Sequence, residues 1–121
     1  MRILITGATA WTDKLAIHRE LSKMPAGSTI VTGDTSGVDA IAKQLASELG
    51  FKLEAMAKTK SDYQHKPKAA WQVLNERMLA TGIDVVLAFH AELGQVGKAR
   101  GTQHALDIAK QAGIACHAFT H

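Results

Sequence analysis

The sequence contains one cysteine, Cys116, and only two prolines among its 121 residues. A single cysteine excludes an intrachain disulfide and a zinc site built from several thiolates. This usage is typical of a reducing compartment, and we expect the protein to be cytoplasmic. No apolar run approaches the roughly 20 residues that a membrane-spanning helix requires. The first residues, MRILITG, lack the features of a secretory signal peptide, so we expect no membrane partner.

Aromatic residues are also scarce, at 5% of the chain, whereas hydrophobic residues together make up 46%. That hydrophobic share is typical of a folded globular domain and argues against disorder. A chain of 121 residues suffices for one hydrophobic core, so we expect residues 1–121 to form one domain. The formal net charge of +3 allows an anionic partner but does not identify nucleic acid.

The basic residues are distributed unevenly along the chain. Four lysines gather in one short stretch: Lys58, Lys60, Lys66 and Lys68. The overlapping segment 57–66 contains too few apolar side chains to form a core of its own. We therefore predict a polar loop at 57–66, which would act as a lid over a bound anion or contact single-stranded nucleic acid.

Short apolar runs alternate with segments of helical periodicity, which is typical of repeated βα units. Strands are predicted at residues 1–6, 28–32, 51–56, 84–89 and 114–119, and four helices lie between them: one capped by Thr12 or Asp13, one over 38–49, one from Pro67 to Gly82, and one that starts at Gly101 and Thr102. Because the strands are apolar on both faces, helices must cover both sides of a parallel sheet. We predict an α/β fold, a Rossmann-like three-layer sandwich with a five-stranded parallel sheet in the order 3-2-1-4-5.

In such sheets, ligands bind outside the carboxyl ends of the strands, where the strand order reverses. This rule selects the loops that follow the first, second and fourth predicted strands. Each loop combines glycine, small hydroxyl residues and a helix start, whose unpaired amides can hold a phosphate. The candidate ligand- or phosphate-binding residues in these loops are Gly7, Ala8, Thr9, Trp11, Gly33, Asp34, Thr35, Ser36, Gly37, Asp39, His90, Arg100, Gly101 and Thr102.

Four of these side chains have specific alternatives. Asp39 lies in a first helical turn, where it either caps the helix or accepts a ribose hydroxyl. Arg100 either makes a bidentate phosphate contact or is solvated. His90 directly follows a strand and is a candidate for an acid or base, although it can equally bind phosphate. Trp11 is a candidate for stacking on a nucleobase, and so is Trp71, although we expect Trp71 to belong to the core or to a dimer surface.

Four short motifs stand in order on these predicted elements. They are T-G-x-x-x-W after the first strand, G-x-x-x-G-x-D after the second, N-x-x-M in the third helix, and A-F-H followed by R-G-T after the fourth strand. With this order the chain resembles the SLOG superfamily, which joins SMF/DprA and LOG-type proteins. The resemblance is to its small YspA/YpsA-like branch, found in bacteria and their phages.

The resemblance implies a Rossmann-like domain whose glycine-rich loops bind a nucleotide or nucleotide-derived ligand. It adds Asn75 and Met78 to the candidate ligand-binding residues and implies a homodimer through the helix after Pro67. The chain also departs from the pattern. The branch usually has Gly-Ser-Arg at Gly7-Ala8-Thr9 and an arginine at Leu74. LOG-type phosphoribohydrolases carry a glutamate three residues after the glycine-threonine pair, where this chain has Ala105.

We predict a module that binds a nucleotide or nucleotide-derived ligand, as a sensor or sequestering protein, with no metal and no cofactor. One alternative is an N-glycosidase acting on nucleoside phosphates, with His90 or an aspartate in place of the missing glutamate. Another is a DprA-like contact with single-stranded DNA through the lysine-rich stretch. Whether the chain is an enzyme stays open.

Overall fold

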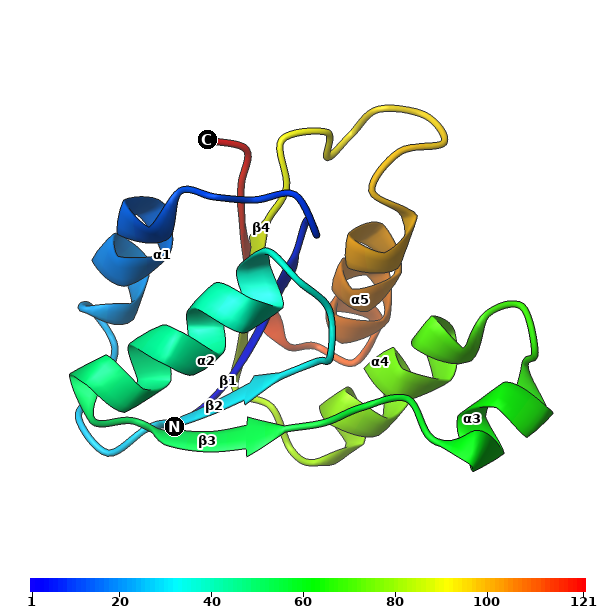
Figure 1. Ribbon diagram of the computed structural model, residues 1–121, viewed down its shortest axis with the longest axis horizontal. Coiled ribbons are helices and arrows are strands. Elements are labelled where there is room, and N and C mark those ends of the chain that lie inside the picture. The colour runs from blue at the N-terminus through cyan, green and yellow to red at the C-terminus, as the bar shows by residue number, and fades with distance from the viewer.

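A computed structural model describes residues 1–121, and Figure 1 shows its strands and helices. In chain order these are β1 (Arg2–Gly7), α1 (Lys14–Leu21), β2 (Thr29–Thr32), α2 (Val38–Leu49), β3 (Lys52–Ala55), α3 (Lys60–His65), α4 (Ala70–Ala80), β4 (Val85–Phe89), α5 (Arg100–Gln111) and β5 (Ala115–Phe119). None of the helices has both the length and the apolar character needed to cross a bilayer.

All five strands are parallel and pair in the order β3-β2-β1-β4-β5. The predicted α/β fold class and strand order are therefore confirmed. The order reverses between β1 and β4, which pair so that Gly7 lies opposite Phe89 at their carboxyl ends. The crevice for a ligand is expected at this point of a doubly wound sheet.

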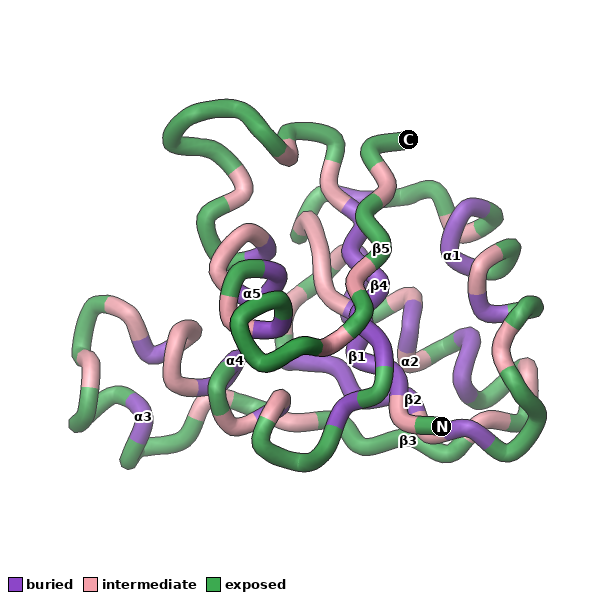
Figure 2. Tube along the Cα trace, turned by 180° about the vertical axis from the view of Figure 1, so that it is seen from behind, coloured by how far each residue is buried: buried purple, intermediate pink, exposed green.

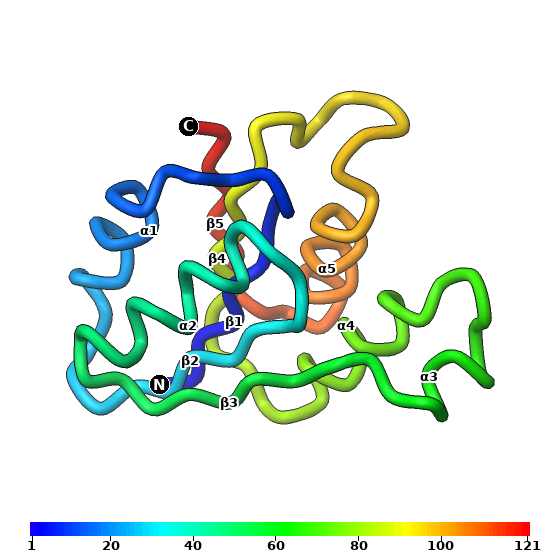
Figure 3. Tube along the Cα trace, viewed as in Figure 1, coloured from blue at the N-terminus to red at the C-terminus, as the bar shows by residue number.

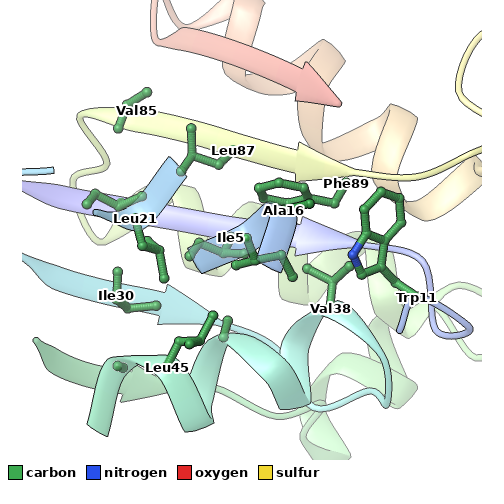
Figure 4. Close-up of a cluster of buried hydrophobic side chains, with 14 residues drawn as sticks. Ile5, Trp11, Ala16, Leu21, Ile30, Val38, Leu45, Val85, Leu87 and Phe89 are labelled. Carbon is green, nitrogen blue, oxygen red and sulfur yellow. The ribbon is translucent and has the colours of Figure 1, made fainter. Parts of the chain in front are cut away.

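Helices cover both faces of the sheet because successive residues of β1 point to opposite sides. Ile3 and Ile5 pack with α1 and α2, and Figure 4 shows part of this cluster around Ile5, Leu87 and Phe89. Leu4, between them in sequence, packs with side chains of α4 and α5 on the other face. The site must therefore lie at the rim of the sheet, because both faces are filled by hydrophobic side chains.

Helix ends agree with the local sequence. The carboxylate of Asp13 caps α1 by accepting a hydrogen bond from the Ala16 amide over 3.1 Å. Helix α2 ends at Gly50, whose φ of 77° is the left-handed conformation that glycine adopts without strain. Asp13 thus marks where the loop after β1 ends and α1 begins, and Gly50 marks where the chain leaves α2 to form β3.

The stretch 57–66 is not the predicted polar loop, because it contains helix α3. The structure thus has five helices rather than four, and the next helix, α4, begins at Ala70 instead of Pro67. Thr59 and Asp62 form a capping box at the start of α3, and Arg77 of α4 donates two hydrogen bonds to the buried Asp62 carboxylate. Helix α3 is thus anchored by an ion pair and carries no apolar stripe. Figure 1 shows α3 at the opposite end of the molecule from α1.

Candidate functional site

A cavity of about 280 Å³ lies at the carboxyl ends of β1, β2 and β4, on the side of the sheet covered by α4 and α5. Thirteen of the predicted site residues line it: Gly7, Ala8, Thr9, Gly33, Asp34, Thr35, Asp39, Asn75, Met78, His90, Arg100, Gly101 and Thr102. Five further residues line it that were not among the predicted site residues: Thr6, Lys58, Trp71, Leu74 and Ala99. The structure therefore brings together residues from five separate segments of the chain at the expected end of the sheet.

Ser36 and Gly37 join two loops instead of lining the cavity. Gly37 has a φ of 71°, and a Cβ there would collide with the carbonyl oxygens of Ala8 and Thr9. The Ser36 hydroxyl donates to the Thr9 carbonyl over 3.0 Å, and the Val38 amide donates to the Ala8 carbonyl over 3.1 Å. Figure 3 shows the two loops at the same end of the sheet. The loop after β1 thus supplies the cap of α2, in place of a capping side chain.

The Asp39 carboxylate organises the loop between Gly33 and α2. Its Oδ2 accepts hydrogen bonds from the amide and the hydroxyl of Thr35, over 3.2 Å and 2.8 Å, and the Thr32 hydroxyl lies 3.1 Å from its Oδ1. A Cβ at Gly33 would lie 2.8 Å from Oδ2, so only glycine leaves room for this arrangement. Burial raises the pKa of Asp39, and the hydrogen bonds from Thr35 and Thr32 offset this only in part.

Asp34 in the same loop contacts Lys58 in the segment that follows β3. The Lys58 ammonium lies 2.6 Å from Asp34 Oδ1, and the Lys58 amide donates to Oδ2 over 3.0 Å. Burial alone would raise the pKa of Asp34, but the hydrogen bonds from Lys58 outweigh it and hold the pKa below its usual value. The ion pair between Lys58 and Asp34 thus forms one side of the cavity and carries no net charge.

The first turn of α5 offers the cavity unpaired hydrogen-bond donors. The amides of Arg100, Gly101 and Thr102 make no hydrogen bond within the protein, and no side chain caps the helix. The exposed Arg100 guanidinium forms no ion pair. The residue before the helix, Ala99, has a φ of 54°, the left-handed conformation that is unfavourable for a residue with a side chain. Strain of this kind is commonly found at binding sites.

Helix α4 supplies the opposite wall, which is mostly apolar: Trp71, Leu74 and Met78 line the cavity from it. Between them the buried Asn75 donates from Nδ2 to the Gly101 carbonyl over 3.1 Å and lies 3.1 Å from Nδ1 of His104. No protein group donates to Asn75 Oδ1. Asn75 Oδ1 is not fully buried, because Arg2 Nε is the one fully buried side-chain nitrogen or oxygen that lacks a partner. The Oδ1 atom is therefore accessible as an acceptor.

His90 lines the cavity at the end of β4. Its ring Nδ1 accepts a hydrogen bond from the Glu92 amide over 3.0 Å, so the neutral ring carries its proton on Nε2. The histidine can therefore donate one hydrogen bond to a bound molecule. The structure holds the ring in one orientation without a carboxylate partner.

Besides Ser36 and Gly37, two residues singled out from the sequence lie outside the cavity lining. Trp11 is 9% exposed and packs edge-to-face on Phe89 with ring centroids 5.8 Å apart, and its Nε1 donates to the Asp13 carbonyl. The structure therefore places the Trp11 indole in the hydrophobic core (Figure 4). Ala105, where LOG-type enzymes have glutamate, is fully buried on the inner face of α5.

No group of three or more histidine, cysteine, aspartate or glutamate side chains is arranged to hold a metal ion. The lysines expected to face an anion are partly engaged within the protein. Lys58 contacts Asp34 as described, and the Lys66 ammonium lies 3.0 Å from Gln72 Oε1 and 3.9 Å from a Glu76 carboxylate oxygen. Two of the four lysines therefore have local partners.

Two comparisons with known proteins identify the class of protein that this fold and site define. Residues 1–59, which include the loops after β1 and β2, match the YAcAr family, described as the YspA, cpYpsA-related SLOG family. The Gene 61 protein of Mycobacterium phage D29 is 34% identical over 121 residues, spanning 93% of this chain and 91% of that protein. The chain belongs to the YspA, cpYpsA-related SLOG family, as its four motifs predict. Membership is consistent with nucleotide-related binding or processing.

Proposed function

We propose that the protein binds a nucleotide or nucleotide-derived ligand in the cavity at the carboxyl ends of the strands. The observation that carries this proposal is the first turn of α5. There three unpaired amides and a guanidinium without an ion pair belong to residues that line the same cavity. A helix start of this kind stabilises an anion through its amides and its dipole, and arginine adds charge-assisted hydrogen bonds to phosphate oxygens.

The remaining surfaces of the cavity suit the other parts of a nucleotide. The apolar side chains of Trp71, Leu74 and Met78 form a wall against which a flat base can pack. Asn75 Oδ1 is a free acceptor for a ribose hydroxyl or a base amine. His90 Nε2 is a free donor on the side where β4 ends. The ligand that fits these groups has an anionic end, hydrogen-bonding groups in its middle and an aromatic end.

The chemistry of the site favours binding over hydrolysis. Glycosidic hydrolysis needs a carboxylate placed to act as acid, base or stabiliser of positive charge. Asp34 and Asp39 are the carboxylates that line the cavity, and Lys58 neutralises Asp34 while two threonines occupy Asp39. The position of the LOG-type glutamate is the buried Ala105. A sensor or sequestering protein therefore agrees better with these residues than an N-glycosidase does.

The test is a binding measurement by calorimetry with AMP, GMP, CMP and UMP, supported by a thermal-shift screen, because a ligand that binds the native state raises its melting temperature. Arg100→Ala is expected to weaken binding about tenfold, since one charge-assisted contact is lost. Arg19→Ala removes an exposed arginine from α1, far from the cavity, and is expected to leave affinity unchanged.

Two further readouts distinguish the rival functions. Release of free base during incubation, detected by chromatography and abolished in His90→Ala, would show that the protein is an N-glycosidase. Affinity for an oligonucleotide that falls steeply with salt, together with no affinity for mononucleotides, would instead favour contact with single-stranded DNA. Equal affinity of the two arginine variants would refute the assignment of phosphate to α5.

A further inference from the structure

A second hollow adjoins the cavity on the other side of the first turn of α5. Its volume is about 460 Å³, and it lies between α4, α5 and the loop that joins β4 to α5. Figure 2 shows this loop, at the upper left, as exposed along most of its length. The hollow has no role in the function proposed above, although it is larger than the cavity that does.

The two hollows share two residues, Trp71 and Arg100. Arg100 makes no ion pair, whereas the Trp71 ring packs edge-to-face on His104 with ring centroids 5.6 Å apart. The indole passes over the helix start where Gly101 has no side chain, with its Cε3 3.8 Å from the position that a Cβ would take. Arg100, the first residue of α5, therefore lies on the border of both hollows.

The chemistry of the second hollow differs from that of the first. Carboxamides line it from three segments, Gln72, Gln95 and Gln103, together with the imidazole of His104. Gln95 makes no side-chain hydrogen bond, and Gln103 uses only its Nε2, which donates to Asp107 over 2.9 Å. Carboxamides pair with the edges of nucleobases and with hydroxyl groups. Charged residues also line the hollow, Lys98, Arg100 and Asp107, and the Lys98 ammonium lies 3.9 Å from a Glu92 carboxylate oxygen. The carboxamides suit a group rich in hydrogen-bonding atoms, such as a second nucleoside.

The volumes of the two hollows also suggest one nucleoside in each. Sites for small organic molecules typically have volumes of about 300–1,000 Å³, and the first cavity, at about 280 Å³, is slightly smaller than that range. It has room for one nucleotide-sized group. A ligand with two such groups would need the second hollow, and the group that connects them would cross the border at Arg100.

We propose that the ligand belongs to the dinucleotide class, with two nucleosides joined through their 5′ carbons by a diphosphate. The diphosphate lies on the first turn of α5 beside Arg100, one nucleoside occupies the first cavity and the other occupies the second hollow. This inference rests on the proposed nucleotide site and specifies its substrate class. Because one molecule carries both nucleosides, the second nucleoside binds its hollow intramolecularly once the first is bound. The affinity is then higher than that of a mononucleotide, without any change in either hollow.

The experiment compares AMP, GMP, CMP and UMP with the corresponding 5′,5′-dinucleoside diphosphates by calorimetry. At least one dinucleoside diphosphate is expected to bind about tenfold or more tightly than its mononucleotide. Gln103→Trp, which fills the second hollow without touching the first, is expected to abolish that advantage and to leave mononucleotide affinity within about twofold. Gln111→Trp, at the exposed end of α5, is the matched control and is expected to keep the advantage.

The outcomes separate the two proposals. If mononucleotides bind and the dinucleoside diphosphates bind no more tightly, the second hollow is not part of the site while the proposed function stands. If no nucleotide of either kind binds, the proposed function fails and this inference fails with it. Preference for a 3′,5′-linked dinucleotide over the 5′,5′-linked form would assign the hollow to a nucleic-acid strand. Should Gln103→Trp not fold, Gln95→Trp fills the same hollow from the loop.

Discussion

The side chain of Asn75 donates a hydrogen bond from Nδ2 to the Gly101 carbonyl oxygen over 3.1 Å and so joins α4 to the start of α5. A carbonyl oxygen only accepts hydrogen bonds, which means that the NH₂ end of the amide must face Gly101. The amide oxygen is then directed away from Gly101 and is free for a ligand. This one hydrogen bond thus holds α4 close to α5 and determines that the Asn75 oxygen, not its nitrogen, is the atom left for a ligand.

Asn75→Asp tests this relationship without changing the size of the side chain. A carboxylate cannot donate to Gly101, and repulsion between its oxygens and the carbonyl oxygen is expected to lower the free energy of unfolding by about 1–3 kcal/mol at pH 7. Urea denaturation measures the change. Asn75→Ala removes the amide without adding charge and should cost less; if it costs more than Asn75→Asp, the hydrogen bond does not set the stability of this contact.

Ala99→Gly is expected to stabilise the protein by about 0.5–1 kcal/mol, because glycine adopts the φ of 54° without the strain that a Cβ causes. The gain is less than the full strain, since glycine also makes the unfolded chain more flexible. Ala112→Gly, at the end of α5 with a φ of −84°, is the control and should be neutral or destabilising. Denaturation of both variants in urea decides whether the start of α5 stores strain.

Gly37→Ala and Gly50→Ala compare a packed glycine with an open one. Gly50 has the left-handed conformation, with φ 77° and ψ 20°, which costs an alanine roughly 1–2 kcal/mol. Gly37 has φ 71° and ψ −122°, a conformation that is essentially restricted to glycine, so backbone strain adds to the collision there. A Cβ at Gly50 meets nothing within 4 Å, whereas at Gly37 it collides with two carbonyl oxygens of the loop after β1. Gly37→Ala is therefore expected to be the more destabilising by several kcal/mol. Similar melting temperatures for the two variants would mean that the loops are not packed as described.

Asp62 gives the stability a predictable dependence on pH. The hydrogen bonds from Arg77 lower the pKa of Asp62 to about 2, below the value of about 3.9 for an unfolded chain. The folded state therefore binds this proton less readily, so the contribution to stability is complete above about pH 4 and is lost as the pH falls toward 2. Melting temperature measured against pH should decline less steeply in this interval for Asp62→Asn. Arg77→Met should have the same effect, and the double variant should add little.

The strands and the rim that holds the cavity were predictable because hydrophobic periodicity reports which side chains are buried. Val85 to Phe89 are all buried, and this continuous apolar run is typical of a central parallel strand. Once the strands are placed, the loops after them must gather at one end of the sheet. Residues as distant as Gly7 and Gly101 could for this reason be assigned to one site without any contact being known.

Helix α3 was missed because a single buried ion pair anchors it, and the partner, Arg77, lies 15 residues from Asp62. The sequence did carry one local signal. Thr59 and Asp62 have the spacing of a capping box, but no apolar run follows them to strengthen it. Of the apolar wall of the cavity, Met78 was predicted, but Trp71 and Leu74 were not assigned to the site. These two residues lie on one helix at a spacing of three residues, which is also the pattern of a helix packed on the core.

The hydrogen bond from the Val38 amide to the Ala8 carbonyl has a consequence for the kinetics of binding. The loop after β1 cannot swing outward without removing the cap of α2, so its backbone is already in the conformation that a ligand meets. Recognition then needs little rearrangement, and the association rate should approach the limit that diffusion and charge attraction set. Differences in residence time among ligands would therefore account for most differences in their affinity.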